Sequence, residues 1–223
     1  MSRWEPDSRG RLQEAALALY SERGFDQTTA AEIAARAGVT ERTFFRHFAD
    51  KREVLFGGSE ILQERIVSGV AGAPAGDTAL EAVARGLDAA AVMLGEGRRD
   101  LTAQRQTVIA ANPDLQEREL AKLATYAAAV AATLRQRGVS ELQATLAAEA
   151  GMSVLRVAIR QWANGDGGRS LPVVMKDSMA ELRAVTAGGT DPMGQDDSVP
   201  TFRGQADFSQ RADELTAGFG GDE

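Results

Sequence analysis

Residues 28–56 read TTAAEIAARAGVTERTFFRHFADKREVLF, and this stretch carries the signals of two short helices joined by a tight turn. Thr29 followed by Glu32 is a capping-box pattern, which predicts the start of the first helix. The tripeptide AGV at 37–39 then interrupts the helical spacing, and Thr40 supplies a cap for the second helix. The pattern predicts a helix-turn-helix, a motif that places its second helix in the DNA major groove.

A second capping pattern, Asp50 with Glu53, follows this motif and predicts a third helix over residues 51–70. The glycine pair at 57–58 lies inside that helix, where each glycine costs about 1 kcal/mol relative to alanine. Two interpretations stay open for the pair. It is either a flaw within a packed, continuous helix or a pivot between an N-terminal head and the rest of the chain.

Helical spacing and capping signals continue along the chain, without the alternation that is typical of strands. The other predicted helices cover residues 9–23, 40–47, 77–94, 98–111, 113–137, 140–164 and 171–187, with Asp77, Asn112 and Ser140 as caps. The fold class predicted is all-α. A three-helix DNA-binding head occupies residues 1–56 and a helical body 57–187, and a polar segment over 188–223 is expected to be disordered.

Composition excludes several classes of protein. The chain has no cysteine and a single histidine, His47, which excludes cysteine-ligated zinc, thiolate chemistry and histidine-rich metal sites. The carboxylate pair at 196–197 lies in the segment expected to be disordered, where nothing would hold a catalytic geometry. Neither a signal peptide nor an apolar run of about 20 residues is evident. We therefore expect a cytoplasmic protein that is not an enzyme, carries no metal or cofactor and does not bind a membrane.

The net charge of -7 is distributed unevenly. Residues 1–56 contain nine basic and nine acidic residues, so the negative charge belongs to the rest of the chain. Within the head, positive charge gathers at Arg42, Arg46, Lys51 and Arg52. Phosphates respond to charge within a Debye length of about 8–10 Å, so the overall acidity does not prevent DNA binding.

Residues 9–56 combine an N-terminal helix, the pairs GF at 24–25 and TT at 28–29, and the run AEIAARAGVTERTFFRHFADKREVL. In this combination the chain resembles the TetR family of bacterial transcriptional repressors. The resemblance implies a homodimer whose heads bind a pseudo-palindromic double-stranded DNA operator and whose bodies bind a small-molecule effector. TFFRHFADKREVL, with Arg105 and the later NPDL at 112–115, is also similar to actinobacterial regulators of the mycofactocin-regulator group. That second similarity implies an acyl-CoA-like effector or another anion.

The same resemblance implies which residues contact DNA. By position these are Thr29, Thr40, Glu41, Arg42, Thr43, Phe45, Arg46, His47 and Lys51. An arginine reads guanine bidentately, and a lysine beside free backbone N–H groups at a helix start suits a phosphate, as Lys51 would. Phe45 departs from the family, because many members carry a tyrosine whose hydroxyl reaches a phosphate; Phe45 would pack against sugars or a thymine methyl instead. For His47, a capping or packing role and a DNA contact both stay open.

The prediction of a ligand site in the body is based on Arg105. This residue lies four positions after Leu101 and four before Ile109, on the apolar face of its helix, and a charge that faces a core requires a partner. The partner is either an internal carboxylate or an anionic group of a ligand. Tyr126 and Trp162 either line the same pocket or pack in the core.

The last two predicted helices have long apolar sides and small residues, which predict a four-helix dimer interface. The apolar positions are Leu142, Leu146, Ala150, Val154, Val157, Ala158, Trp162, Val174, Met179, Leu182 and Val185. The function expected is therefore that of a homodimeric repressor released by a ligand. A DNA-binding regulator without a small-molecule ligand and an activator are the alternatives.

Overall fold

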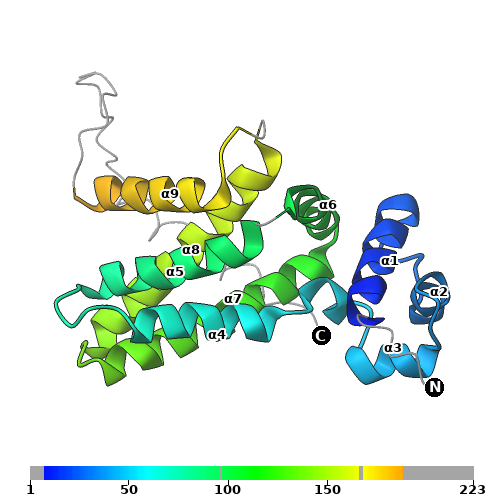
Figure 1. Ribbon diagram of the computed structural model, residues 1–223, viewed down its shortest axis with the longest axis horizontal. Coiled ribbons are helices and arrows are strands. Elements are labelled where there is room, and N and C mark those ends of the chain that lie inside the picture. The colour runs from blue at the N-terminus through cyan, green and yellow to red at the C-terminus, as the bar shows by residue number, and fades with distance from the viewer. Residues whose placement is uncertain (1–7, 96, 166–167, 188–223) are drawn as a thin grey trace, which may run out of the picture. The chain divides into compact units, whose positions relative to one another are not determined.

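The computed structural model describes residues 8–95, 97–165 and 168–187, and all regular elements in these ranges are helices (Figure 1). In chain order they are α1 (Ser8–Arg23), α2 (Ala30–Arg36), α3 (Glu41–His47), the 3-10 helix η1 (Glu53–Phe56), α4 (Ser59–Ala71), α5 (Ala79–Gly95), α6 (Arg99–Ala110), α7 (Pro113–Gln136), α8 (Glu141–Asn164) and α9 (Leu171–Thr186). The all-α prediction is confirmed. The segment 188–223, with its carboxylate pair, lies outside the described residues.

The capping signals of the helix-turn-helix act as predicted. The Thr29 hydroxyl accepts the N–H of Glu32 at 3.2 Å, and the Glu32 carboxylate accepts the N–H of Thr29 at 2.9 Å, which completes the capping box. Thr40 caps α3 by accepting the N–H of Thr43 at 3.2 Å. Between the two helices Gly38 adopts a φ of 69°, in the left-handed region that favours glycine.

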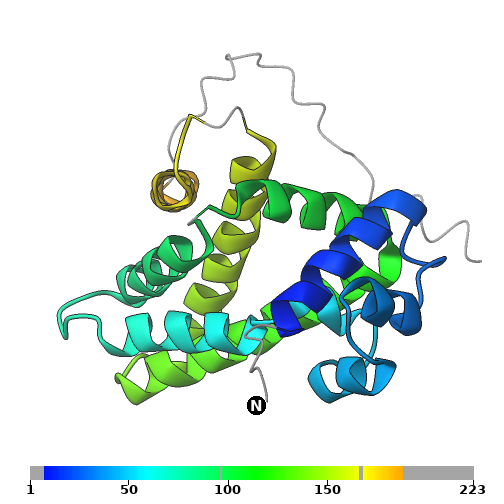
Figure 2. The same cartoon turned by 45° about the vertical axis from the view of Figure 1, so that its right-hand side comes forward.

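Helices α1, α2 and α3 pack around a buried cluster that body residues complete. Leu12, Ile33 and Phe44 are fully buried in this cluster. Val108 from α6 and Leu115 from α7 belong to the same cluster, and Figure 2 shows α6 next to α1. The core of the head therefore depends on two helices that come more than 40 residues later in the chain, which the sequence did not predict.

The prediction of one continuous helix over 51–70 is wrong. Asp50 accepts the backbone N–H groups of Arg52 and Glu53, at 2.8 and 3.1 Å, but the element that follows is the single turn η1, whose N-cap residue is Arg52. Gly58 then adopts a φ of 92°, and this left-handed backbone separates η1 from α4. The Glu53 carboxylate forms ion pairs with α7 instead of completing a second capping box. The two glycines therefore mark a break between two elements, not a flaw inside one.

The body is a bundle in which α4 packs on α5 and α7, α7 packs on α8, and α9 packs on α5 and α8 (Figure 1). One buried cluster, which includes Leu87, Val130 and Leu155, fills its interior. Helices α4 and α5 approach each other at two glycines, since a Cβ placed on Gly69 would lie only 2.7 Å from the Cα of Gly86. This close approach excludes any side chain at the crossing.

The predicted caps of the body helices are partly correct. Asn112 caps α7 by accepting a backbone N–H of the first turn at 3.3 Å. The cap of α5 is Thr78 and not Asp77, because Thr78 and Glu81 form a reciprocal capping box. Ser140 occupies the N-cap position of α8 without a side-chain hydrogen bond.

Among the described residues, α8 is long and apolar enough to cross a membrane by length and composition alone. The share of its apolar window buried inside the structure is 39%, and α8 packs against α5, α6, α7 and α9. Core helices satisfy the same criterion, so this is weak evidence for a membrane segment.

Candidate nucleic-acid interface and effector site

The outer face of α3 carries two arginines without partners. Arg42 and Arg46 lie one helical turn apart and are both exposed. Within the described part of the chain, neither side chain makes a hydrogen bond or an ion pair. On the opposite face Phe44 is fully buried, and its contacts with the head core fix the rotation of α3 about its axis. Both guanidinium groups are therefore turned away from the protein and available to another molecule.

Five other predicted DNA contacts belong to α2, α3 and their N-cap positions. Thr29 and Thr40 are the exposed N-cap residues of α2 and α3, and Glu41 is the exposed first residue of α3. The Thr43 hydroxyl lies 3.0 Å from the Thr40 hydroxyl. The Phe45 ring is 53% exposed, which leaves an apolar surface free for a thymine methyl or a sugar. The helix-turn-helix thus leaves four of these five residues exposed, and Phe45 supplies the apolar group that the resemblance implies.

Lys51 is held inside the head. Its ammonium donates to the carbonyl oxygens of Phe25, Asp26 and Thr28 at 2.9, 3.3 and 3.0 Å, which employs all three N–H groups. It also lies 4.3 Å from the centroid of the Phe25 ring, and the Tyr20 hydroxyl donates to the Lys51 carbonyl at 2.6 Å. The position expected for Lys51, at the start of a helix, is wrong because η1 begins two residues later. Its contact with a phosphate stays a prediction.

Replacing Lys51 with methionine is expected to lower the free energy of unfolding by about 2 kcal/mol, because three carbonyl groups lose a charged donor. Urea unfolding followed by circular dichroism measures this change. The matched control is Arg65→Met on α4, an exposed arginine without a hydrogen bond or ion pair among the described residues. The contrary outcome is that the two variants are equally stable and that Lys51→Met alone binds DNA more weakly, with a shallower salt dependence. This result would identify Lys51 as a phosphate contact instead.

His47 contacts the start of α1. Its Nε2 lies 3.0 Å from the Ser8 hydroxyl. Burial of the ring, followed by the positive charges of Arg46 and Arg9, lowers the pKa of His47 below its ordinary value of 6.5. In the free protein His47 therefore has the packing role, and the contact with DNA stays a prediction.

The titration of His47 separates these two roles. Because it is the only histidine in the chain, its NMR signals are resolved without assignment, and we expect a pKa below 6.5 in the free protein. A pKa that is lower in the folded than in the unfolded state gives a stabilisation present above pH ~6.5, which is lost as the pH falls through the folded-state value. A phosphate beside the ring would raise the pKa, so a DNA contact predicts tighter binding at lower pH. If the pKa of His47 does not change when the protein is saturated with DNA, His47 has only the packing role.

Arg105 binds internal groups where the head meets the body. Its Nε donates to the Leu55 carbonyl at 2.7 Å, and its Nη1 lies 3.5 Å from the Glu119 carboxylate. The guanidinium also lies 5.0 Å from the centroid of the Phe56 ring. Burial lowers the pKa of Arg105, and the Glu119 charge opposes that shift. Of the two partners left open by the sequence, the structure contains the internal carboxylate.

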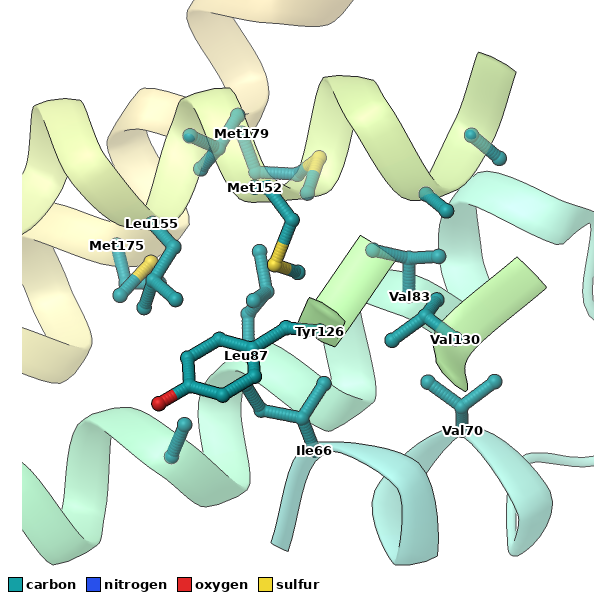
Figure 3. Packing of buried hydrophobic residues seen from close by; sticks show 14 of the residues in the cluster. Ile66, Val70, Val83, Leu87, Tyr126, Val130, Met152, Leu155, Met175 and Met179 are labelled. Carbon is teal, nitrogen blue, oxygen red and sulfur yellow. The ribbon is translucent and has the colours of Figure 1, made fainter. Parts of the chain in front are cut away.

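Tyr126 and Trp162 lie in the core of the body, with 6% and 4% of their surfaces exposed. The Tyr126 ring lies among Ile66 and Leu87 (Figure 3), and burial raises the pKa of its hydroxyl. Core packing, one of the two interpretations of the sequence, is the role that both have in this structure.

The described residues form at least two cavities. The smaller, of about 170 Å³, includes His47, Glu53 and Lys122 in its lining. The larger, of about 690 Å³, lies between α6, α7 and α8, with Arg156 and Arg160 in its lining. Arg105, Tyr126 and Trp162 line neither cavity. The larger cavity was not predictable from the sequence, because its walls come from three separate helices.

A capped two-helix motif with free arginines on its outer face, attached to a helical body, defines a helix-turn-helix DNA-binding protein. Residues 12–56 match the family model described as "Bacterial regulatory proteins, tetR family". The HTH-type transcriptional regulator TcmR of Streptomyces glaucescens is 37% identical over 76 residues, which are 34% of this chain and 34% of that protein. The match thus spans about a third of that relative's length. Residues 12–56 are therefore similar to the tetR family of bacterial regulatory proteins.

Solved structures of regulators share the fold over most of this chain. FadR from Bacillus subtilis, in complex with stearoyl-CoA, has a TM-score of 0.56 at 21% identity, and the alignment covers 82% of this chain and 99% of FadR. The fatty acid degradation regulator FadR from Bacillus halodurans has a TM-score of 0.53 at 18% identity, with 81% and 96% covered. At these identities the similarity establishes the fold alone.

Proposed function

We propose that the protein is a homodimeric transcriptional repressor, acting in the cytoplasm, that binds a double-stranded operator and is released by a small-molecule effector. Residues 1–56 bind DNA, and residues 57–187 dimerise and bind the effector. The observation that carries the proposal is the pair Arg42 and Arg46, exposed and unpartnered on the outer face of α3. Guanidinium groups on a helix that fits the major groove bind guanine edges and phosphates.

The homodimer uses the outer edges of α8 and α9. Leu142, Leu146 and Val185 are 70%, 61% and 78% exposed, and such apolar surface marks a protein interface. Part of the predicted interface is wrong, because those residues are buried within the subunit: Val154, Ala158, Trp162, Val174 and Met179. A two-fold dimer presents two α3 helices, and this implies a pseudo-palindromic operator.

The effector is proposed to be acyl-CoA-like. Support comes from the fold shared with FadR, which was solved with stearoyl-CoA. The cavity of about 690 Å³ adds to this support, because small-molecule sites span about 300–1,000 Å³. Binding of the effector favours a head spacing that no longer matches two successive grooves, which requires a preference of several kcal/mol for that state.

Selection of bound fragments from a random DNA library tests this function. We expect one pseudo-palindromic sequence to be enriched and the purified complex to be dissociated by an acyl-CoA. Enrichment of no sequence contradicts the DNA-binding role. Enrichment without release by any anionic ligand contradicts the effector and identifies a regulator that acts without one.

A further inference from the structure

The cavity between α6, α7 and α8 combines apolar and cationic walls. Ala110 and Leu120 contribute apolar surface, and Leu120 is 53% exposed although it is a large apolar side chain. Arg156 and Arg160 project from α8 on the other side, one helical turn apart and both exposed. Among the described residues neither arginine makes a hydrogen bond or an ion pair. Two unpaired like charges at this spacing repel each other, and an anion placed between them removes that repulsion.

We propose that this cavity is the effector site and that it takes an amphipathic anion. The phosphate or carboxylate group binds Arg156 and Arg160, whose planar guanidinium groups suit bidentate contacts with either anion. The apolar chain lies against Ala110 and Leu120. This inference rests on the proposed function and assigns the anion to α8 instead of Arg105, because the guanidinium of Arg105 already binds Glu119 and the Leu55 carbonyl.

The wall of the cavity is connected to the DNA-binding head. Glu119 lines the cavity and accepts hydrogen bonds from Gln106 at 3.3 Å and from Arg105 at 3.5 Å. Arg105 in turn donates to the Leu55 carbonyl of η1, the element that follows α3 in the chain. Ile109 lines the cavity and also belongs to the buried cluster of the head. A ligand that displaces Gln106 or Glu119 therefore loosens the hold of Arg105 on η1.

Calorimetric titration of the full-length protein with lauroyl-CoA tests the site. Laurate and CoA without an acyl chain are separate arms, which distinguish a carboxylate from the phosphates as the bound group. The double variant Arg156→Ala/Arg160→Ala is expected to bind lauroyl-CoA at least tenfold more weakly, with operator affinity in the absence of ligand unchanged. Arg65→Glu on α4 is the matched control: it changes the net charge by the same two units away from the cavity, and its affinity for lauroyl-CoA should equal that of the wild type.

The variant Ala110→Trp fills the cavity without changing a charge and is expected to weaken lauroyl-CoA binding to a similar extent. If both variants bind lauroyl-CoA as tightly as the wild type does, the proposed location of the effector site is wrong. The proposed class of effector is not contradicted by that result. If the double variant loses its dimer in light scattering while Ala110→Trp binds normally, the two arginines belong to the subunit interface and the inference fails. If none of the three probes binds the wild type, the amphipathic anion is excluded. The operator affinity of the same protein samples tests the DNA-binding function separately.

Discussion

Arg42→Ala is expected to weaken operator binding by about 1–3 kcal/mol, roughly five- to 150-fold, and to relax selectivity at one base position. The guanidinium is exposed and unpartnered in the free protein, so its loss removes a bidentate contact with DNA and no contact within the head. Arg42→Ala/Arg46→Ala should lose both guanidinium contacts and bind the operator no better than unrelated DNA. Fluorescence anisotropy with the selected operator and a scrambled duplex measures both affinities at fixed salt.

Arg65→Ala is the control for this comparison, because it removes one positive charge from α4 and leaves α3 intact. It should bind the operator as tightly as the wild type does. Circular dichroism confirms that the variants are folded, which we expect because neither arginine of α3 contributes to the head core. Unchanged operator affinity and selectivity for Arg42→Ala would show that α3 does not lie in the groove.

Gly86→Val is expected to lower the free energy of unfolding by about 3 kcal/mol, at the upper end of the usual cost of overpacking. A Cβ at this position would lie 2.6 Å from the carbonyl oxygen of Ile66 and 2.8 Å from the Val70 side chain. The first of these contacts is with backbone, so α4 and α5 have to separate before valine fits. Separation exposes the cluster that Ile66 and Leu87 help to fill (Figure 3), and the gain in helix propensity from replacing glycine does not offset that loss.

Gly76→Ala is the comparison for this variant, because a Cβ there meets nothing within 4 Å. Its unfolding free energy should stay within about 0.5 kcal/mol of the wild type. Urea unfolding of both variants gives the two values. A Gly86→Val protein as stable as the Gly76→Ala protein would contradict the view that glycine sets the distance between α4 and α5.

The features of the fold that were predictable from the sequence are those determined by residues that lie close together along the chain. Thr29 and Thr40 cap helices through N–H groups three residues away, so both helix starts were located correctly. The role of the glycine pair at 57–58 was left open because Asp50 gives the same signal before a 3-10 turn as before a longer helix. Only the left-handed φ of Gly58 distinguishes the two outcomes, and glycine permits either conformation.

The long-range contacts were not predictable. Glu53 pairs with Arg118 and Lys122 on α7, and Arg105 reaches the Leu55 carbonyl 50 residues away. The spacing of apolar residues shows which face of a helix is apolar, but it does not show which other part of the protein packs against that face. For the same reason Trp162 was placed on the dimer face and left open between a pocket and the core, and it packs in the core of its own subunit.

Methylation protection of guanine N7 on the selected operator tests whether α3 enters the major groove, because N7 is accessible only there. We expect two symmetric sets of protected guanines, with centres one helical turn of about 10–10.5 base pairs or a multiple apart. Protection within each set should be lost in Arg42→Ala. A single unsymmetrical patch, or binding that leaves every guanine N7 reactive, would contradict a dimer that inserts two α3 helices into the major groove.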